Sequence, residues 1–142
     1  MTAPRDNRLV MADVGRADFR PSTAADAACG ALQRHLALTF RYQPARMAIA
    51  KSLSIASTPP APSDSAGRSI RGETLFGKDV EEQALWITLV AQHAGRSDLT
   101  KRDVQDLVAA HWSRGAAALE EQWADTNGDI EAFVSRLVTR KR

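Results

Sequence analysis

The chain has 142 residues, of which 44% are hydrophobic and 25% are charged, so it can bury one core but is too short for two large domains. Its single cysteine excludes an intramolecular disulfide, and no apolar run approaches the roughly 18 residues of a membrane span. The formal net charge is +2, yet residues 1–72 hold 10 Lys and Arg against 5 Asp and Glu, whereas residues 73–142 hold 9 against 12. The basic character is therefore local to the first half of the chain.

Residues 1–17 show no sustained hydrophobic period and are expected to form a loose N-terminal arm. The segment "RADFRPS" at its end is expected to be extended, because a residue before proline is pushed away from helical geometry. These residues lack the apolar run of a secretory signal peptide, which predicts a cytoplasmic protein. Residues 18–142 are then expected to form a single compact helical domain.

The domain is expected to begin with a helical hairpin over residues 23–56. Thr23 and Asp26 have the spacing of a capping box, and apolar residues then recur at intervals of three and four, which predicts a first helix over 24–38. Cys29 lies on the apolar face of this helix, so the pattern favours a buried, inert thiol over a reactive one.

The second helix of the hairpin is predicted from "QPARMAIAKSLS". Pro44 suits the first helical position, and the residues after it carry an apolar stripe with helical spacing. The helix is expected to end before "STPPAPSDSAG", whose prolines and serines predict a linker over residues 57–68. This linker marks the boundary between the basic and the acidic parts of the chain.

Residues 69–142 are expected to be mainly helical. The stretch "RSIRGETLFGKD" has two glycines and is interpreted as an ordered loop or a short extended piece. Asp79 and Glu82 repeat the capping-box spacing, and "VEEQALWITLVAQHA" then runs to Gly95, a C-terminal stop signal. Because the apolar residues of this helix point in nearly every direction around its axis, it is expected to be central and buried on most sides.

Two further helices are predicted before the chain ends. Thr100 and Asp103 give a third capping-box spacing, followed by apolar residues at helical intervals. The break "TNGD" then separates that helix from a last one in "IEAFVSRLV". No alternating strand pattern of useful length occurs. The predicted fold is therefore mainly α, a single domain of about five helices.

Signatures of catalysis and metal binding are absent from the sequence. It has no Walker loop, no paired-cysteine motif, no H-E-x-x-H and no G-x-S-x-G. His35, His93 and His111 are scattered, and each is interpreted as a surface or packed histidine rather than a ligand or base. Neighbouring acids such as Glu81 and Glu82 diverge around a helix, which does not favour a shared metal. We therefore predict no catalytic residue, no metal and no cofactor, and an enzyme is not favoured.

A basic surface is the strongest functional signal. The 37 residues from Ala27 to Ser63 contain no acid, whereas ordinary solvated helices mix both signs. Arginine grips phosphate with a planar fork, and an aromatic ring among arginines can stack on a base or sugar. The pattern favours phosphate binding over a merely solvated face. The predicted DNA-binding residues are Arg34, Arg41, Tyr42, Arg46, Lys51, Arg68, Arg71 and Lys78.

Taken in order, "FRYQPARMAIAKSLS", the proline-rich linker, "IRGETLFG", "ALWITLV" and "AAHWSRGAAALEEQW" resemble the DndE family of DNA sulfur modification proteins. The similarity runs from about residue 19 to about residue 138. The resemblance implies a small, mainly helical accessory protein of the bacterial phosphorothioation system, in which sulfur replaces a non-bridging oxygen of the DNA backbone.

The resemblance also implies partners and contacts. Family members look like homo-oligomers, typically tetramers, that bind double-stranded DNA with a preference for nicks, while sulfur activation belongs to partner proteins of the system. The stretch that matches the family's loop between its first two helices is "TFRYQPAR", so the DNA-contact assignment passes to Arg41 and Arg46. The expected function is therefore that of a DNA-binding accessory protein in phosphorothioation.

Three other functions fit parts of the sequence. A ribbon-helix-helix regulator would pair "DFRPS" as a strand and read bases in the major groove, but Pro21 interrupts such pairing. A DNA-nicking nuclease needs convergent carboxylates or a histidine poised near phosphate, and the sequence presents neither. A scaffold would use the basic face to bind an acidic protein partner.

Overall fold

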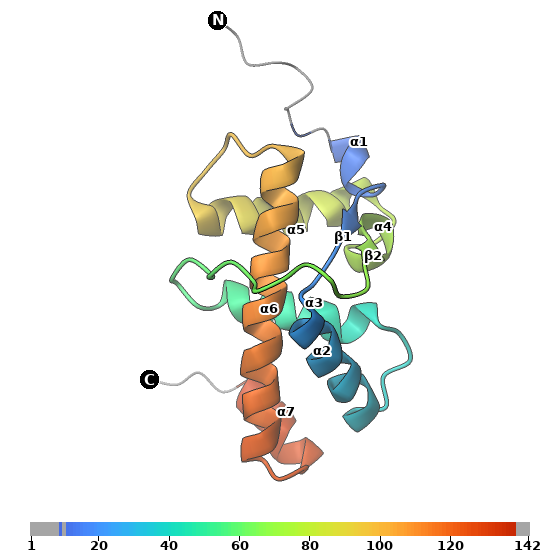
Figure 1. Cartoon of the computed structure of the whole chain (residues 1–142), viewed down its shortest axis with the longest axis vertical. Coiled ribbons are helices and arrows are strands. Elements are labelled where there is room, and N and C mark those ends of the chain that lie inside the picture. The colour runs from blue at the N-terminus through green and yellow to red at the C-terminus, as the bar shows by residue number, and fades with distance from the viewer. Residues whose placement is uncertain (1–8, 10, 139–142) are drawn as a thin grey trace, which may run out of the picture.

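The structure of the protein is a computed structural model that describes residues 9 and 11–138. The described chain is mainly α-helical, as the sequence predicts, with one small antiparallel pair of strands (Figure 1). None of the described helices is long and apolar enough to cross a membrane. The elements are α1 (Met11–Val14), β1 (Asp18–Phe19), α2 (Thr23–His35), α3 (Tyr42–Leu53), β2 (Ile70–Arg71), α4 (Gly72–Leu75), α5 (Val80–Ala94), α6 (Lys101–Asp125) and α7 (Ile130–Val138).

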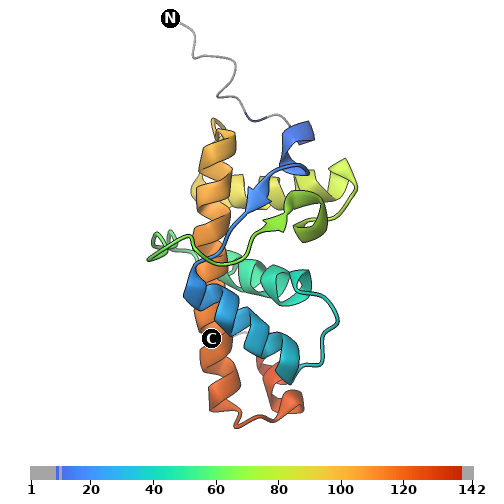
Figure 2. The same ribbon diagram turned by 45° about the vertical axis from the view of Figure 1, so that its right-hand side comes forward.

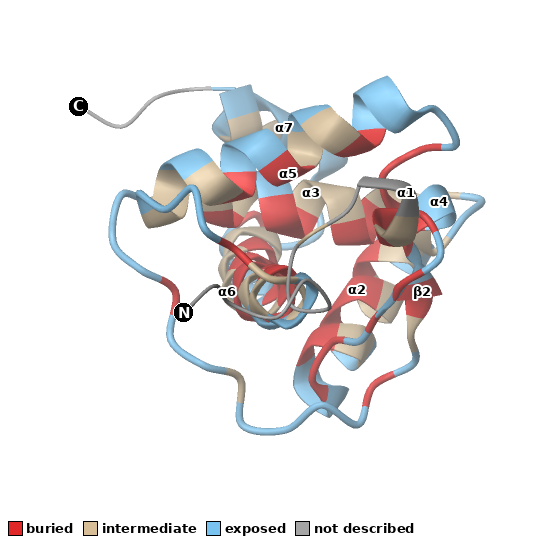
Figure 3. Ribbon diagram, turned by 90° about the horizontal axis from the view of Figure 1, so that it is seen from above, coloured by how far each residue is buried: buried red, intermediate tan, exposed pale blue. Residues whose placement is uncertain are grey.

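The long helix α6 is the axis of the fold. Figure 1 shows α3 and α5 crossing it, and Figure 3 shows the buried residues gathered where the helices meet. Thr100 and Asp103 start α6 with the predicted capping box, in which each side chain accepts the other's backbone N–H at 3.1 Å. Val104, Val108 and Trp112 are each at most 1% exposed on its inner face. Helix α6 therefore takes the central position in the core.

Helix α5 is peripheral, and the expectation that it is central was wrong. Ile87 and Val90 face the core, whereas Leu85 and Leu89 on the opposite face are 60% and 39% exposed. Apolar residues all around a helix indicate burial on most sides. Here the rest of the described chain lies on the inner side of α5, so its outer leucines stay in solvent.

Helices α3 and α6 approach each other at backbone distance, and they make the most extensive contact between any two elements described. Ala45, Ala48 and Ile49 of α3 are fully buried. A Cβ placed on Gly115 of α6 would lie 1.6 Å from the carbonyl oxygen of Ala48. Residue 115 must therefore lack a side chain, because even a methyl group does not fit between the two backbones.

Replacing Gly115 by alanine is expected to lower the free energy of unfolding by at least about 3 kcal/mol, because α3 and α6 must separate to admit the methyl group. Chemical denaturation followed by circular dichroism measures the change. Gly30→Ala is the matched control, since its Cβ would come no closer than 3.7 Å to a neighbouring side chain. That substitution is expected to raise stability by up to about 1 kcal/mol. Equal stability of the two variants would contradict this packing.

The predicted linker follows a fixed path across α6 on its way from α3 to β2 (Figure 2). Asp64 Oδ1 accepts hydrogen bonds from the backbone N–H and the hydroxyl of Thr23, at 2.8 and 3.0 Å. The N–H of Gly67 donates to the carbonyl of Pro21 at 3.0 Å. The segment is non-helical, as its prolines predict, and these bonds hold it against the start of α2.

Two of the three predicted capping boxes are not formed, and two helix limits differ from the prediction. The N-cap of α2 is Ser22, whose hydroxyl accepts from the N–H of Ala25 at 3.0 Å, because Thr23 is bonded to the linker instead. Asp79 precedes α5 without a side-chain capping bond. Pro44 is the third residue of α3 rather than the first, and α2 ends at His35.

The N-terminal segment expected to be a loose arm is packed where it is described. Residues 1–8 and 10 lie outside the described residues, but Met11–Val14 form α1, and Val14 and Ala17 are buried. The carbonyl of Ala17 accepts a hydrogen bond from the N–H of Gly72 at 2.8 Å. A single helical turn carries too few residues to show a hydrophobic period, so this packing could not be predicted from the residue pattern.

Candidate nucleic-acid interface

A groove of about 810 Å³ lies between the loop that joins α2 to α3 and the segment formed by β2 and α4. Strand β2 pairs with β1, so that Phe19 stands opposite Ile70 and ties this wall of the groove to the core. Three of the described residues that line the groove are basic and none is acidic. The lining residues are Gln33, Thr39, Phe40, Arg41, Tyr42, Ser69, Ile70, Arg71, Thr74 and Lys78.

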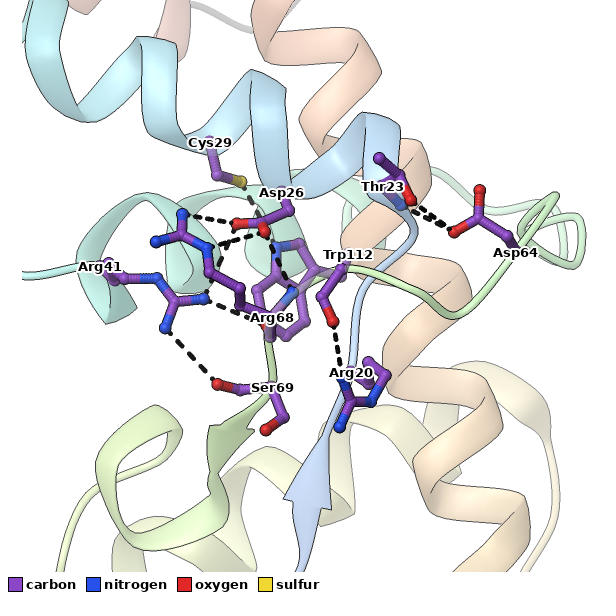
Figure 4. Close-up of polar contacts among 10 residues, drawn as sticks. Arg20, Thr23, Asp26, Cys29, Arg41, Asp64, Arg68, Ser69 and Trp112 are labelled. Atoms are coloured by element: carbon purple, nitrogen blue, oxygen red, sulfur yellow. Dashed lines mark hydrogen bonds and ion pairs between the residues drawn. The ribbon is translucent and has the colours of Figure 1, made fainter.

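Arg41 and Arg68 meet at Asp26 on one side of the groove (Figure 4). Arg68 Nε and Nη2 donate to the two carboxylate oxygens of Asp26 at 2.9 and 3.0 Å. These hydrogen bonds hold the pKa of Asp26 below its usual value of 3.8. Arg41 Nη2 donates to the carbonyl of Arg68 at 3.1 Å and lies 3.7 Å from Asp26. Both arginines therefore fix the end of the linker to α2, and part of their charge is neutralised within the protein.

Arg46 connects α3 to α4 beneath the groove. Its Nη2 donates to the carbonyl of Thr74 at 3.2 Å, and its Nε donates to the carbonyl of Leu75 at 2.5 Å. The last carbonyls of a helix have no partner within the helix, so a guanidinium at this end is favourable. Arg46 is thus a structural support in this conformation, because two of its nitrogens are bonded to backbone carbonyls of the protein.

The ring of Tyr42 contacts one residue that precedes it in the chain and one that follows it. The Arg46 Cζ lies 4.4 Å from the Tyr42 ring centroid, and the Phe40 ring stacks on Tyr42 at 5.4 Å with an angle of 14° between the planes. Phe40 is 53% exposed, whereas Tyr42 is partly buried. The aromatic surface open to solvent at the groove therefore belongs to Phe40, which was not among the predicted residues.

The remaining predicted cations differ in position. Arg71 and Lys78 line the groove and are exposed. Arg71 Nε lies 4.0 Å from a carboxylate oxygen of Asp18, and both side chains are more than half exposed, so water screens the pair. Arg34 on α2 and Lys51 on α3 do not line the groove. The structure thus brings four of the eight predicted residues together on the groove: Arg41, Tyr42, Arg71 and Lys78.

A buried polar network joins the end of α3 to α6. Ser52 Oγ lies 2.8 Å from His111 Nδ1, and Arg114 Nε donates to the same oxygen at 2.8 Å. Arg114 also donates to the carbonyls of Ser52 and Ser57, at 2.8 and 2.7 Å. Ser52 and His111 are both 0% exposed, so this serine–histidine pair holds two helices together and is closed to substrate.

His93 and His111 are packed within the protein, and His35 is exposed but stacks on another ring. The ring of His35 stacks on Trp123 at 4.7 Å, and His93 Nε2 lies 2.6 Å from the carbonyl oxygen of Ile55. The ring of His93 also meets His111 edge-on at 4.7 Å. Among the described residues, no group of three or more His, Cys, Asp and Glu is placed to hold a metal ion.

The protein is expected to become less stable as the pH is lowered, because His111 is buried in its neutral form. Burial, with smaller contributions from His93 and Arg114, lowers the pKa of His111 from 6.5 to about 4. Between these values the unfolded chain binds a proton that the folded chain does not, so the free energy of unfolding decreases as pH falls from about 6.5 to about 4, by an amount on the order of 3 kcal/mol. Urea denaturation at a series of pH values measures this slope.

His111→Gln serves as the comparison for that series. Glutamine cannot take up a proton, so the variant is expected to lose the slope between about pH 6.5 and pH 4, whatever its stability at neutral pH. Carboxylates with lowered pKa values, such as Asp26 and Asp103, lose their contribution only at lower pH. Parallel curves for the two proteins above pH 4 would show that His111 is not the titrating group.

Cys29 is the buried, free thiol that the sequence predicts. Trp112 Nε1 donates to its sulfur at 3.4 Å, and burial raises the pKa of the thiol to about 11. Because the thiolate is the reactive form, this cysteine is inert at neutral pH.

These features define a small α-helical protein whose basic groove lies beside a helix–helix core. Residues 19–126 match the model of the family described as DNA sulphur modification protein DndE, and the chain belongs to this family. The family resemblance seen in the sequence is thereby confirmed, and the protein is involved in DNA sulfur modification. A comparison with curated proteins gave no match. The matched residues run from β1 to the end of α6, so they include every residue that lines the groove.

Proposed function

We propose that the protein is a DNA-binding accessory protein of the sulfur modification system, and that it contacts the backbone of double-stranded DNA through the groove. The observation that carries this proposal is the charge of the groove, whose described lining holds Arg41, Arg71 and Lys78 and no acid. Family membership supplies DNA as the polyanion. In this role the protein works in the cytoplasm beside the partner proteins that activate sulfur.

The basic residues of the groove contribute to binding in two ways. Arg71 and Lys78 are exposed and can reach phosphates without breaking a buried contact. Arg41 is held by backbone carbonyls, with its side chain 35% exposed, and adds positive potential at a fixed position. Phosphate contacts of this kind position a protein on a duplex and carry no sequence information. We therefore propose binding without strong sequence preference.

A preference for nicked duplex is part of the same proposal. A nick leaves the duplex stacked but hinged, so a protein that bends DNA at the break works against a smaller deformation energy. The groove has walls from two separate segments, the α2–α3 loop and β2–α4, which offers contacts on both sides of such a hinge. Competition between nicked and intact duplexes of one sequence at one salt concentration tests the preference, and equal affinity would leave only general DNA binding.

Replacing both Arg71 and Lys78 by glutamine is expected to weaken binding to every duplex alike. The wild-type slope of log affinity against log salt is expected to be about −3 for three phosphate contacts, and about −1 in the double variant, because each cation contributes about −0.9. Fluorescence anisotropy titrations between about 50 and 200 mM salt measure both slopes. Arg41 and Arg46 are unsuitable for this test because both hold backbone carbonyls.

Lys101→Gln with Arg102→Gln is the matched control for that double variant. It removes the same charge from the exposed start of α6, and neither residue lines the groove. The control is expected to keep the wild-type slope. A flat salt response of the wild-type protein, or an equal loss in both double variants, would sink the assignment of DNA binding to the groove.

We also propose that the protein is a homo-oligomer. Large apolar residues support an oligomer only where a single chain leaves them exposed. Ile87, Val90 and Trp112 are buried within one chain, so they do not support this proposal. The support comes from apolar side chains that one chain leaves exposed on α5 and on α7, which other copies can cover. They are Val80, Leu85 and Leu89 on α5 and Ile130, Val134 and Val138 on α7.

Sedimentation equilibrium at micromolar concentration is expected to give a multiple of the chain mass of 15.4 kDa. Replacing Leu85 and Leu89 by glutamine is expected to shift the equilibrium toward the monomer without lowering the stability of the fold, since both side chains are exposed in one chain. A single 15.4 kDa species for the unmodified protein would remove the proposal.

A ribbon-helix-helix regulator is not supported. Phe19 is 1% exposed and pairs with Ile70 of the same chain. The strand that would pair between two copies and enter the major groove is thus part of one chain's core.

A further inference from the structure

The groove carries stacked aromatic rings that are not required for binding the backbone of a paired duplex. The guanidinium of Arg46 lies over Tyr42, Tyr42 stacks on Phe40, and Phe40 is 53% exposed beside the groove. The exposed ring of Phe40 offers a flat apolar surface to another planar group. Tyr42, the ring that the sequence singled out for stacking, is instead the middle member of this stack.

The partner of this surface has to be flat and to carry negative charge close to its flat part. Phe40 lines the same groove as Arg71 and Lys78, and no acidic residue is among the described residues that line it. A base within a duplex hides both faces in the stack, so it cannot lie on Phe40. A nucleotide that has left the stack presents a free base face and a phosphate together, and single-stranded binding sites use this combination of aromatic ring and cation.

We propose that the groove receives one unpaired nucleotide of DNA at the edge of a nick, with its base stacked on Phe40 and its phosphate held by Arg71 and Lys78. This inference rests on the proposed DNA binding and states what the groove recognises. The volume of about 810 Å³ is within the range of sites that enclose a ligand of this size. The hydroxyl groups of Thr39 and Thr74 line the same space and can bond the edge of the base.

The test uses three duplexes of one sequence that differ only at the break. The first has a simple nick, the second carries one additional unpaired thymidine at the nick, and the third carries an abasic site in place of that thymidine. Affinities of the full-length chain are measured by fluorescence anisotropy at one salt concentration. The wild-type protein is expected to bind the thymidine duplex at least about fivefold more tightly than the abasic duplex, as stacking of one base on an aromatic ring predicts.

Three variants assign this difference to Phe40. Phe40→Leu keeps an apolar side chain but removes the ring, and is expected to bind the thymidine and abasic duplexes equally. Phe40→Trp keeps an aromatic ring and is expected to retain the difference. Thr58→Ala is the control, since Thr58 is exposed in the linker and does not line the groove. Retained discrimination in Phe40→Leu, or its loss in Phe40→Trp or Thr58→Ala, would overturn the inference.

The outcomes separate this inference from the proposed function. Salt-dependent binding of the nicked duplex by the wild-type protein, with equal affinity for the thymidine and abasic duplexes, overturns the nucleotide site and leaves DNA binding intact. Absence of salt-dependent binding to any of the three duplexes overturns both.

Discussion

The contact between α3 and α6 is the constraint on which the rest of the structure depends. Gly115 allows the backbone of α3 to touch α6 at Ala48, and the buried bonds among Ser52, His111 and Arg114 fix the end of α3 on the same helix. Because α3 is held at its middle and at its C-terminal end, the position of its first turn is fixed as well. The first turn of α3, which carries Tyr42, is thereby set beside α4, and this placement forms the groove.

The arginines of the acid-free stretch have partners that a count of charges does not reveal. Arg41 and Arg46 of this stretch donate to backbone carbonyls of the linker and of α4, and Arg114 of α6 donates to carbonyls at and after the end of α3. Carbonyls in irregular segments need donors when they are partly buried, and one guanidinium can serve several of them at once. The missing acids are thus explained in part by structure, because these arginines stabilise irregular backbone. The positive potential remains at Arg46, since a carbonyl accepts a hydrogen bond without neutralising the charge, whereas Asp26 offsets part of the charge of Arg41.

The sequence predicted local features well and relations between distant segments poorly. Capping residues and helical periods placed α5, α6 and α7 within a few residues, since these signals act over one or two turns. The same signals could not show that α6 rather than α5 is central, because a period reports which face of a helix is apolar and not what covers it. The pairing of Phe19 with Ile70 joins segments about fifty residues apart, and a strand of two residues is too short to show a pattern that predicts it. Three of the seven predicted cations line the groove, because a charge pattern along the chain does not show which segments meet. Phe40 was missed because it lies in a loop outside any apolar stripe.

Hydrogen bonding to the protein divides the residues around the groove into those that build it and those that can meet a ligand. Arg46 and Arg68 bond to carbonyls or to Asp26, so a change at either alters the walls of the groove as well as its charge. Phe40, Arg71 and Lys78 are exposed on those walls, and the fold does not depend on their tips. Substitutions at Phe40, Arg71 and Lys78 can therefore change what the groove recognises while the fold stays constant. The specificity of this groove is a property of Phe40, Arg71 and Lys78, and its shape depends on the bonds that Arg46 and Arg68 make to the protein.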